Sequence, residues 1–293
     1  MKYVWAFNPF DKNKKLDKKA VALVRSILGS KEKVEAVFVA SRSYAELSTA
    51  FDVPEQDRFS KYPEQLMQTA MKKLQIRVSK CTVLAEETVS LTNSVKLLAA
   101  YLDRSKTTVA VVASRAKTGL SRLVMGSFAE SLVHFSPVDL LIFNENSSVS
   151  KRPPRTLLFA HDYSKSADKG LDRAIDYAKA WGSALHVIHI PDPAYGFKFS
   201  GQEAEVENYR KRVRQKLARI EEKVKRAGVL GSVELDPRWS PVAERILKRA
   251  SAVSADFVLV VAKSGKLASL LGGSVTRQIL RVSPVPVLVV KRV

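Results

Sequence analysis

Short apolar runs alternate with longer amphipathic stretches along this chain. In the second half the runs at 156–160 (TLLFA), 184–190 (ALHVIHI) and 257–262 (FVLVVA) predict buried strands, and weaker patterns predict strands at 232–235 and 285–290. Between the strands, apolar residues recur every three or four positions, which is typical of helices with one buried face. These helices are expected at 167–181, 203–226, 241–251 and 274–282.

The first half follows the same order. Its expected strands are 4–7, 34–40, a weak one at 78–83, and 108–113, and its expected helices are 14–28, 64–74 and 94–102. Strands of continuous Val, Leu and Ile that alternate with amphipathic helices indicate a parallel sheet covered on both faces. We therefore expect an α/β fold with two doubly wound, parallel, five-stranded sheets in tandem.

The end of each half carries one repeated pattern. Residues 126–143 read GSFAESLVHFSPVDLLIF and residues 273–290 read GSVTRQILRVSPVPVLVV, at a constant offset of 147 (273 minus 126). Such self-similarity argues for duplicated domains. The stretch 144–154 between the copies is polar, ends in prolines and has no apolar periodicity. We expect a first domain at 1–146, a linker at 147–154 and a second domain at 155–293.

Composition adds a strong basic bias. The 293 residues hold 49 Lys and Arg against 29 Asp and Glu, a net charge of +20. Basic and acidic residues alternate along 203–226, which is typical of a solvated helix face. Cys81 is the single cysteine, so an intrachain disulfide and a cysteine-cluster zinc site are excluded. The chain has no apolar stretch of membrane-spanning length and no leader pattern, and we expect a cytoplasmic protein without membrane association.

Ligands of doubly wound sheets bind beyond the carboxyl ends of the strands, where the strand order reverses. Asn8 and Asp162 follow the first strand of each copy. A carboxylate there accepts hydrogen bonds from a ribose or a base amine, and an Asx turn that ends the strand is an equally weighted alternative. After the fourth strand stand 113–116 (ASRA) and 262–265 (AKSG), each leading to Gly-Ser and a helix. Such a helix start can bind an anion, although an ordinary Ser N-cap is commoner.

With Asp162 after its strand, Gly-Ser at the helix start and PVLVV at 286–290, the chain resembles the universal stress protein family. Its doubled pattern resembles the tandem members. The resemblance implies a non-catalytic stress-response protein that binds ATP or a related adenine nucleotide in its second domain. It also implies pairing through the last strands, here 140–143 and 287–290, within the chain or as a dimer.

The resemblance also implies which residues contact the nucleotide. In the second copy these are Asp162, Ile190, Ala262, Gly265, Gly273, Ser274 and Val275. The weaker candidates of the first copy are Asn8, Ala113, Ala116, Gly126 and Ser127.

Both copies depart from the motif of nucleotide-binding members, which is Gly-x-x-Gly, nine residues, then Gly-Ser or Gly-Thr. The first copy keeps the spacing but has Ala113 and Ala116 for the two loop glycines. The second copy has Ala262 for the first glycine and only seven residues between Gly265 and Gly273. An alanine methyl obstructs the close approach of a phosphate to the backbone. A protein that keeps the fold as a ligand-free interaction module is therefore the alternative.

Cations next to these loops are compatible with nucleotide binding and with a ligand-free interaction module. The loop cations Arg115, Lys117, Lys263 and Lys266 either compensate for the lost glycines or are solvated charges.

Other chemistry finds little support. No Gly-x-Ser-x-Gly elbow and no Gly-x-x-x-x-Gly-Lys-Ser/Thr loop occurs. His186 and His189 lie three apart in one strand and so point to opposite faces, which argues against a shared metal. His161 is expected to be a loop histidine.

The basic charge generates a prediction about nucleic acid. We expect no sequence-specific DNA binding, because no basic motif interleaved with aromatic residues occurs. Non-specific binding should weaken steeply with salt, since it depends on phosphate contacts by Lys and Arg. A footprint on duplex DNA that survives roughly 200 mM salt would contradict this expectation.

Overall fold

The computed structural model describes residues 1–11, 13–29, 33–42, 44, 53–114, 127–191, 203–236, 241–262 and 274–291. For residues 203–206, 209, 210 and 274 it describes the backbone only. The chain divides into two compact units, Met1–Pro153 and Pro154–Lys291. In the described part of the chain, no helix is both long enough and apolar enough to cross a membrane.

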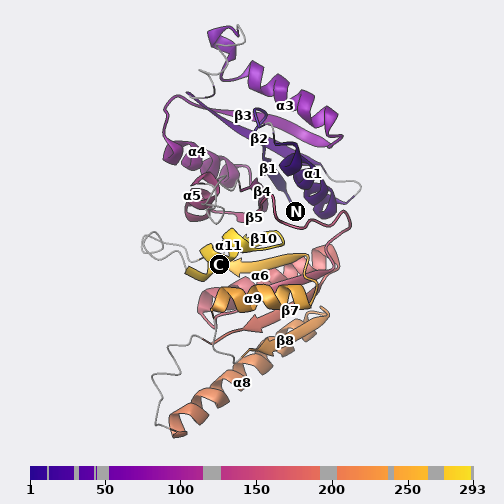
Figure 1. Cartoon of the computed structure of the whole chain (residues 1–293), viewed down its shortest axis with the longest axis vertical. Helices are drawn as coiled ribbons and strands as arrows, with labels where there is room; N and C mark the ends of the chain where they lie inside the picture. Colours follow the sequence, from indigo (N-terminus) through magenta and orange to yellow (C-terminus); the bar gives the residue numbers. More distant parts are fainter. Residues whose placement is uncertain are drawn as a thin grey trace. The chain divides into compact units, whose positions relative to one another are not determined.

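The first unit is a parallel sheet with helices on both faces (Figure 1). Its described strands are β1 (Tyr3–Ala6), β2 (Val34–Ser41), β3 (Val78–Glu86), β4 (Val109–Ala113) and β5 (Asp139–Phe143). Its described helices are α1 (Lys14–Leu28), the 3-10 turn η1 (Glu55–Asp57), α3 (Lys61–Lys73), α4 (Leu91–Arg104) and α5 (Ser127–Phe135). The strand order is β3-β2-β1-β4-β5. Right-handed crossovers place α1 and α3 on one face and α4 and α5 on the other.

The second unit repeats this arrangement. Its described strands are β6 (Thr156–Ala160), β7 (Ala184–His189), β8 (Gly231–Leu235), β9 (Phe257–Val261) and β10 (Val287–Val290). Its described helices are α6 (Lys165–Trp181), α8 (Glu203–Arg226), α9 (Val242–Ala252) and α11 (Ser274–Val282). The parallel order is β8-β7-β6-β9-β10, which matches the first unit strand for strand. The expected doubly wound α/β fold is confirmed in both units.

Apolar strands between two helical layers form the core of each unit. All residues of β5 and of β10 are buried, as the continuous apolar runs predict. Local signals set the helix ends: the Asn13 side chain accepts from the backbone N–H groups of Lys15 and Leu16 at the start of α1, and Gly182 ends α6 in the left-handed conformation.

The strand expected to be weak at 78–83 was predicted too short. β3 runs over nine residues, from Val78 to Glu86, and is at the edge of the strand order, paired with β2. Most of its side chains are exposed or half-buried. An edge strand of this kind has little apolar periodicity, so backbone pairing with β2 extends it beyond what the sequence pattern shows.

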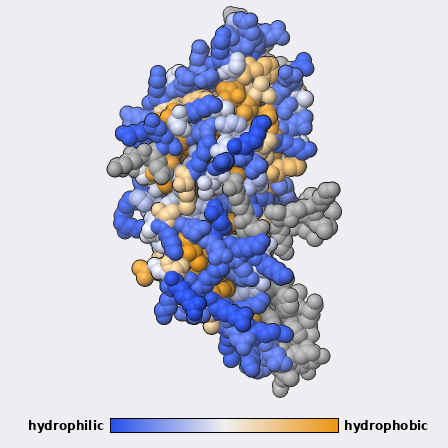
Figure 2. Space-filling model, turned by 180° about the vertical axis from the view of Figure 1, so that it is seen from behind, coloured by the Kyte–Doolittle hydropathy of each residue, from blue (hydrophilic) through white to orange (hydrophobic). Residues whose placement is uncertain are grey.

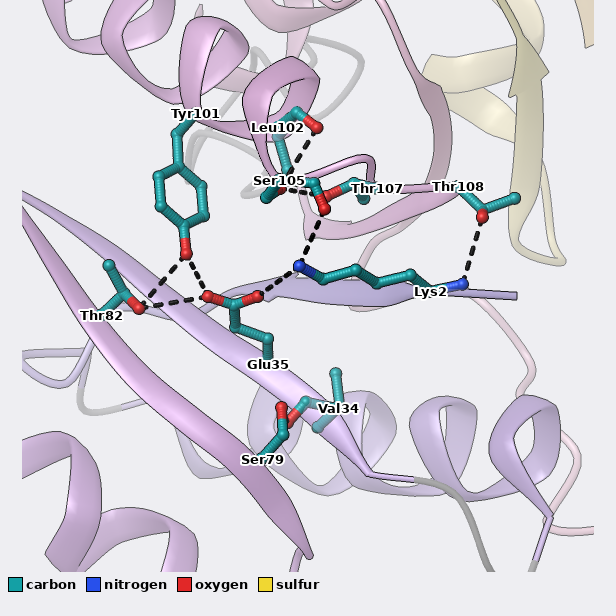
Figure 3. Close-up of polar contacts among 10 residues, drawn as sticks. All are labelled: Lys2, Val34, Glu35, Ser79, Thr82, Tyr101, Leu102, Ser105, Thr107 and Thr108. Carbon is teal, nitrogen blue, oxygen red and sulfur yellow. Dashed lines mark hydrogen bonds and ion pairs between the residues drawn. The ribbon is translucent and has the colours of Figure 1, made fainter.

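A buried carboxylate ties the amino ends of the first unit's strands together (Figure 3). Glu35 of β2 accepts hydrogen bonds from the Tyr101 hydroxyl and, at 3.2 Å, from Thr82 Oγ1. Lys2 Nζ lies 3.1 Å from the same carboxylate and also donates to the Ser105 carbonyl oxygen at 2.9 Å. Burial by itself raises the pKa of Glu35, but the hydrogen bonds from Tyr101, Lys2 and Thr82 outweigh it, and the net pKa is lowered.

This network generates a prediction about stability. Tyr101→Phe should lower the free energy of unfolding of the first unit by about 1.5 to 3 kcal/mol at pH 7, because the carboxylate loses a charge-assisted hydrogen bond. A lowered folded pKa means that the stabilisation is present above the ordinary pKa of 4.5 and is lost as the pH falls through the folded value. Urea unfolding of the wild type and of Tyr101→Phe should therefore show a difference in the free energy of unfolding that disappears as the solution is made acidic. An equal difference in the free energy of unfolding at pH 7 and pH 3 would contradict this account.

Candidate functional site

The carboxyl ends of β1 and β6 occupy equivalent places, next to the point where the strand order reverses. The backbone N–H of Phe7 donates to the Val37 oxygen at 2.9 Å, and that of His161 donates to the Ile188 oxygen at 2.9 Å. This shared register makes Phe7 the counterpart of His161. One residue further, Asn8 is the counterpart of Asp162, as the sequence pattern predicts.

Both of these polar residues form Asx turns. Asn8 Oδ1 accepts from the Phe10 N–H at 3.0 Å, and Asp162 Oδ1 accepts from the Ser164 N–H at 3.0 Å. The turn considered as an alternative to a ligand contact is thus present in both units. Asp162 is exposed, and its carboxylate can accept several hydrogen bonds at once, so the turn does not use up its capacity.

His161 lies beyond its strand, as expected, but it is buried rather than a plain loop residue, with 2% of its surface exposed. Its Nδ1 accepts from the Tyr163 N–H at 3.0 Å, so the neutral ring carries its proton on Nε2, which lies 3.3 Å from Asp168 Oδ1. Burial lowers its pKa to about 4, although Asp168 and Asp162 act in the opposite direction. His161 is therefore neutral at pH 7.

His189 continues this cluster from the end of β7. Its Nδ1 donates to the His161 carbonyl oxygen at 2.7 Å, and its Nε2 has no hydrogen-bond partner among the described residues. The Tyr163 ring stacks on it with centroids 3.7 Å apart, and Lys216 Nζ of α8 lies 5.0 Å from the Tyr163 ring centroid. Burial lowers the pKa of His189 as well. Tyr163 adopts a left-handed φ of 59°, which is uncommon for a residue other than glycine.

The other predicted residues of the second copy lie partly within the described chain. Ile190 and Ala262 are buried and directly follow β7 and β9, the two neighbours of β6. Ser274 and Val275 begin α11. Gly265 and Gly273 lie outside the described residues, as do the loop cations at 115, 117, 263 and 266.

The strand register changes one detail of the motif comparison. Motif spacing pairs Ala113 with Ala262, but Ala113 is the last residue of β4. The Ser114 N–H donates to the Phe143 oxygen, and the Ala262 N–H donates to the Val290 oxygen, so Ser114 is the counterpart of Ala262. Counted from these residues to Gly126 and Gly273, the second copy is one residue shorter than the first. The backbone hydrogen bonds between neighbouring strands determine this alignment. The sequence motif alone does not reveal them.

In the first unit a cavity of about 570 Å³ lies at the carboxyl ends of β1, β2 and β4. We call it the first-unit cavity. Residues of α1, α4 and the start of α5 complete its wall, and the rings of Trp5, Phe7, Phe38, Tyr44 and Phe128 line it. It brings together Asn8, Ala113 and Ser127 of the first-copy candidates. Ala116 and Gly126 lie outside the described residues.

Sequence reasoning missed the buried histidine cluster and this cavity. Phe7 and Phe38 stand where the second copy has His161 and His189, but the offset of 147 in the repeat does not pair these positions. Only the strand register aligns these positions.

Both units thus belong to the class of doubly wound α/β domains whose functional edge lies at the reversal of strand order. Residues 154–291 match the model of the universal stress protein family. The second unit is therefore a universal stress protein domain, and the first unit has the same fold. No curated protein sequence matches the chain.

Two solved structures match this chain over nearly its whole length, and a third matches about half of it. A universal stress protein from Archaeoglobus fulgidus DSM 4304 is 19% identical, with a TM-score of 0.67 over 99% of this chain and 98% of its own. A functionally unknown protein from Pseudomonas aeruginosa PAO1 is 15% identical, with a TM-score of 0.60 over 99% and 92%. A universal stress protein solved in complex with cAMP is 22% identical and covers 48% of this chain and 98% of its own, with a TM-score of 0.36.

The histidine cluster generates a prediction about pH. Because the folded pKa of His161 lies below its ordinary value of 6.5, the unfolded chain binds the proton first, and stability falls as the pH drops from about 6.5 to about 4. A shift of this size corresponds to a loss of about 3 kcal/mol. His161→Phe, which copies Phe7 of the first unit, should flatten this slope in urea unfolding between pH 7 and pH 4. An unchanged slope would assign the acid sensitivity to other groups.

Proposed function

We propose that the protein is a non-catalytic universal stress protein that binds ATP or a related adenine nucleotide in its second unit. The observation that carries this proposal is Asp162, an exposed carboxylate that follows β6 beside the reversal of strand order. A carboxylate at this place suits the ribose hydroxyls of a nucleotide, which donate hydrogen bonds. Because Oδ1 alone accepts in the Asx turn, the carboxylate retains capacity for such donors.

Positive groups near this edge suit the phosphates. The N-terminus of α11, at Ser274, presents backbone N–H groups and the positive end of a helix dipole. Lys216 lies close enough to the cluster to lower the pKa of His189. The two histidines are neutral at pH 7, so they add no positive charge to that of Lys216 and the helix start.

The base would lie against the carboxyl end of β7, where Ile190 offers a buried apolar side chain. Neutral imidazoles and the Tyr163 ring surround this end of the strand. Such a mixture of apolar and aromatic groups with few polar atoms is usual for the base of a bound nucleotide. Occupancy of this site would then connect the protein to the nucleotide state of a stressed cell.

One observation favours a second candidate, a ligand-free interaction module. The Tyr163 ring already stacks on His189, so the chain's own side chain covers the carboxyl end of β7. In this case the second unit would keep its fold and present the edge to another protein.

Calorimetric titration with ATP separates the two candidates. Asp162→Ala should weaken ATP binding on the order of tenfold to a hundredfold, because a charge-assisted hydrogen bond is worth roughly 1.5 to 3 kcal/mol. Asn8→Ala is the matched control, since Asn8 holds the same turn in the first unit. It should leave ATP affinity unchanged.

Two other outcomes would revise the proposal. No measurable binding of millimolar ATP to the wild type would favour the ligand-free module. Loss of binding in Asn8→Ala with normal binding in Asp162→Ala would move the nucleotide to the first unit.

A further inference from the structure

We propose that the first-unit cavity binds a small molecule with an apolar, ring-containing body and no anionic group. This ligand is uncharged or cationic, and its site is separate from the nucleotide site proposed for the second unit. A volume of about 570 Å³ is in the range of pockets that hold drug-sized ligands.

The wall of the cavity is aromatic, and its rings hold one another in place. Trp5 and Phe7 meet edge to face with centroids 4.9 Å apart. The Tyr44 ring stacks on Phe10 at 5.4 Å and meets Phe38 edge to face at 5.2 Å. Mutual packing of this kind restricts the rings before a ligand arrives, which lowers the entropy cost of binding.

Comparison between the units shows that the apolar character is specific to the first. Phe7 and Phe38 replace the buried His161 and His189, and Asn8 replaces the carboxylate of Asp162. The Asn8 amide is also engaged, because its Nδ2 donates to the Tyr44 hydroxyl at 2.9 Å while Oδ1 holds the Asx turn. The first unit therefore lacks the carboxylate and the polar rings that would contact the nucleotide proposed for the second.

Two carboxylates lie among the described residues that line the cavity. Asp11 and Asp17 are among the residues that line it, and no Lys, Arg or His is among its described lining residues. A phosphate or carboxylate beside these two side chains would lose its hydration and meet like charges.

Neutral hydrogen-bonding groups remain for orientation. Ser41, Ser94 and Ser127 come from three different elements and line the cavity. Their hydroxyls have no hydrogen-bond partner among the described residues. A few hydroxyls in an otherwise apolar pocket suit a ligand with one or two neutral polar groups.

Exposed apolar side chains extend the cavity lining to the surface. Val89 and Leu91 line the cavity and are 68% and 42% exposed. Hydrophobic residues also reach the surface of the first unit in Figure 2, in its upper part, among mostly hydrophilic neighbours. An apolar molecule would therefore meet apolar side chains before it is enclosed.

Two fluorescent probes that share one ring system test the proposal on the full chain. N-phenyl-1-naphthylamine is uncharged, and 8-anilino-1-naphthalenesulfonate is the same molecule with one sulfonate. We expect saturable binding of one uncharged probe per chain in the cavity. Ser94→Phe, which fills the cavity from α4, should weaken this binding at least tenfold. Thr92→Phe adds the same ring at an exposed position of the same helix and should change nothing.

The anionic probe and ATP provide the charge test. The sulfonate probe should show no binding that Ser94→Phe removes, because its interaction with the basic surface does not involve the cavity. Millimolar ATP should not displace the uncharged probe. Ser41→Phe, from β2, is the second cavity variant if circular dichroism shows that Ser94→Phe does not fold.

Three results would overturn the inference. The first is the absence of saturable binding of the uncharged probe to the wild type. The second is equal affinity of uncharged probe for the wild type and a folded cavity variant. The third is a cavity-dependent affinity for the sulfonate probe that equals that for the uncharged probe. None of these results depends on whether the second unit binds a nucleotide.

Discussion

The reversal of strand order at β1 and at β6 is the constraint on which the rest of each unit depends. A parallel sheet must bury both faces, so helices cover both of them. Only the ends of the strands then remain accessible to a ligand. Where successive crossovers go to opposite faces, the helices diverge and the carboxyl ends of the strands are left partly uncovered. The first-unit cavity and the histidine cluster both lie at this position. At the opposite ends of the strands in the first unit, hydrogen bonds and an ion pair to the buried Glu35 carboxylate link the amino ends.

The two units show how one backbone arrangement supports different chemistry. The Asx turns of Asn8 and Asp162 have the same donor spacing and the same distance, but the residues that follow differ, because Tyr163 is left-handed and its counterpart Pro9 cannot be. Side chains at corresponding positions then differ in kind, with phenylalanines in one unit and histidines in the other. The imidazoles form hydrogen bonds with the backbone that phenylalanine rings cannot form, so the exchange changes the polarity of this region.

Local signals made most of the fold predictable from the sequence. The bounds of α1 agree with the prediction because a side-chain cap and a clear apolar stripe delimit it. β3 was harder, since an edge strand is held by backbone pairing that leaves little trace in its side-chain pattern. Asp162 was correctly placed at the end of its strand, because an acidic residue directly after a buried run is visible in the sequence. The burial of His161 was not visible, since it depends on rings from Phe159 and Tyr163 and on the neighbouring β7.

Trp5 has a consequence for spectroscopy. Its indole forms part of the wall of the first-unit cavity and is 2% exposed, while the strand register places Phe159 at the corresponding position of the second unit. Indole emission changes in wavelength and intensity with the polarity of its surroundings, and phenylalanine emits only weakly. The first unit thus contains an intrinsic optical reporter of the contents of its cavity, and the second unit has none at the equivalent place.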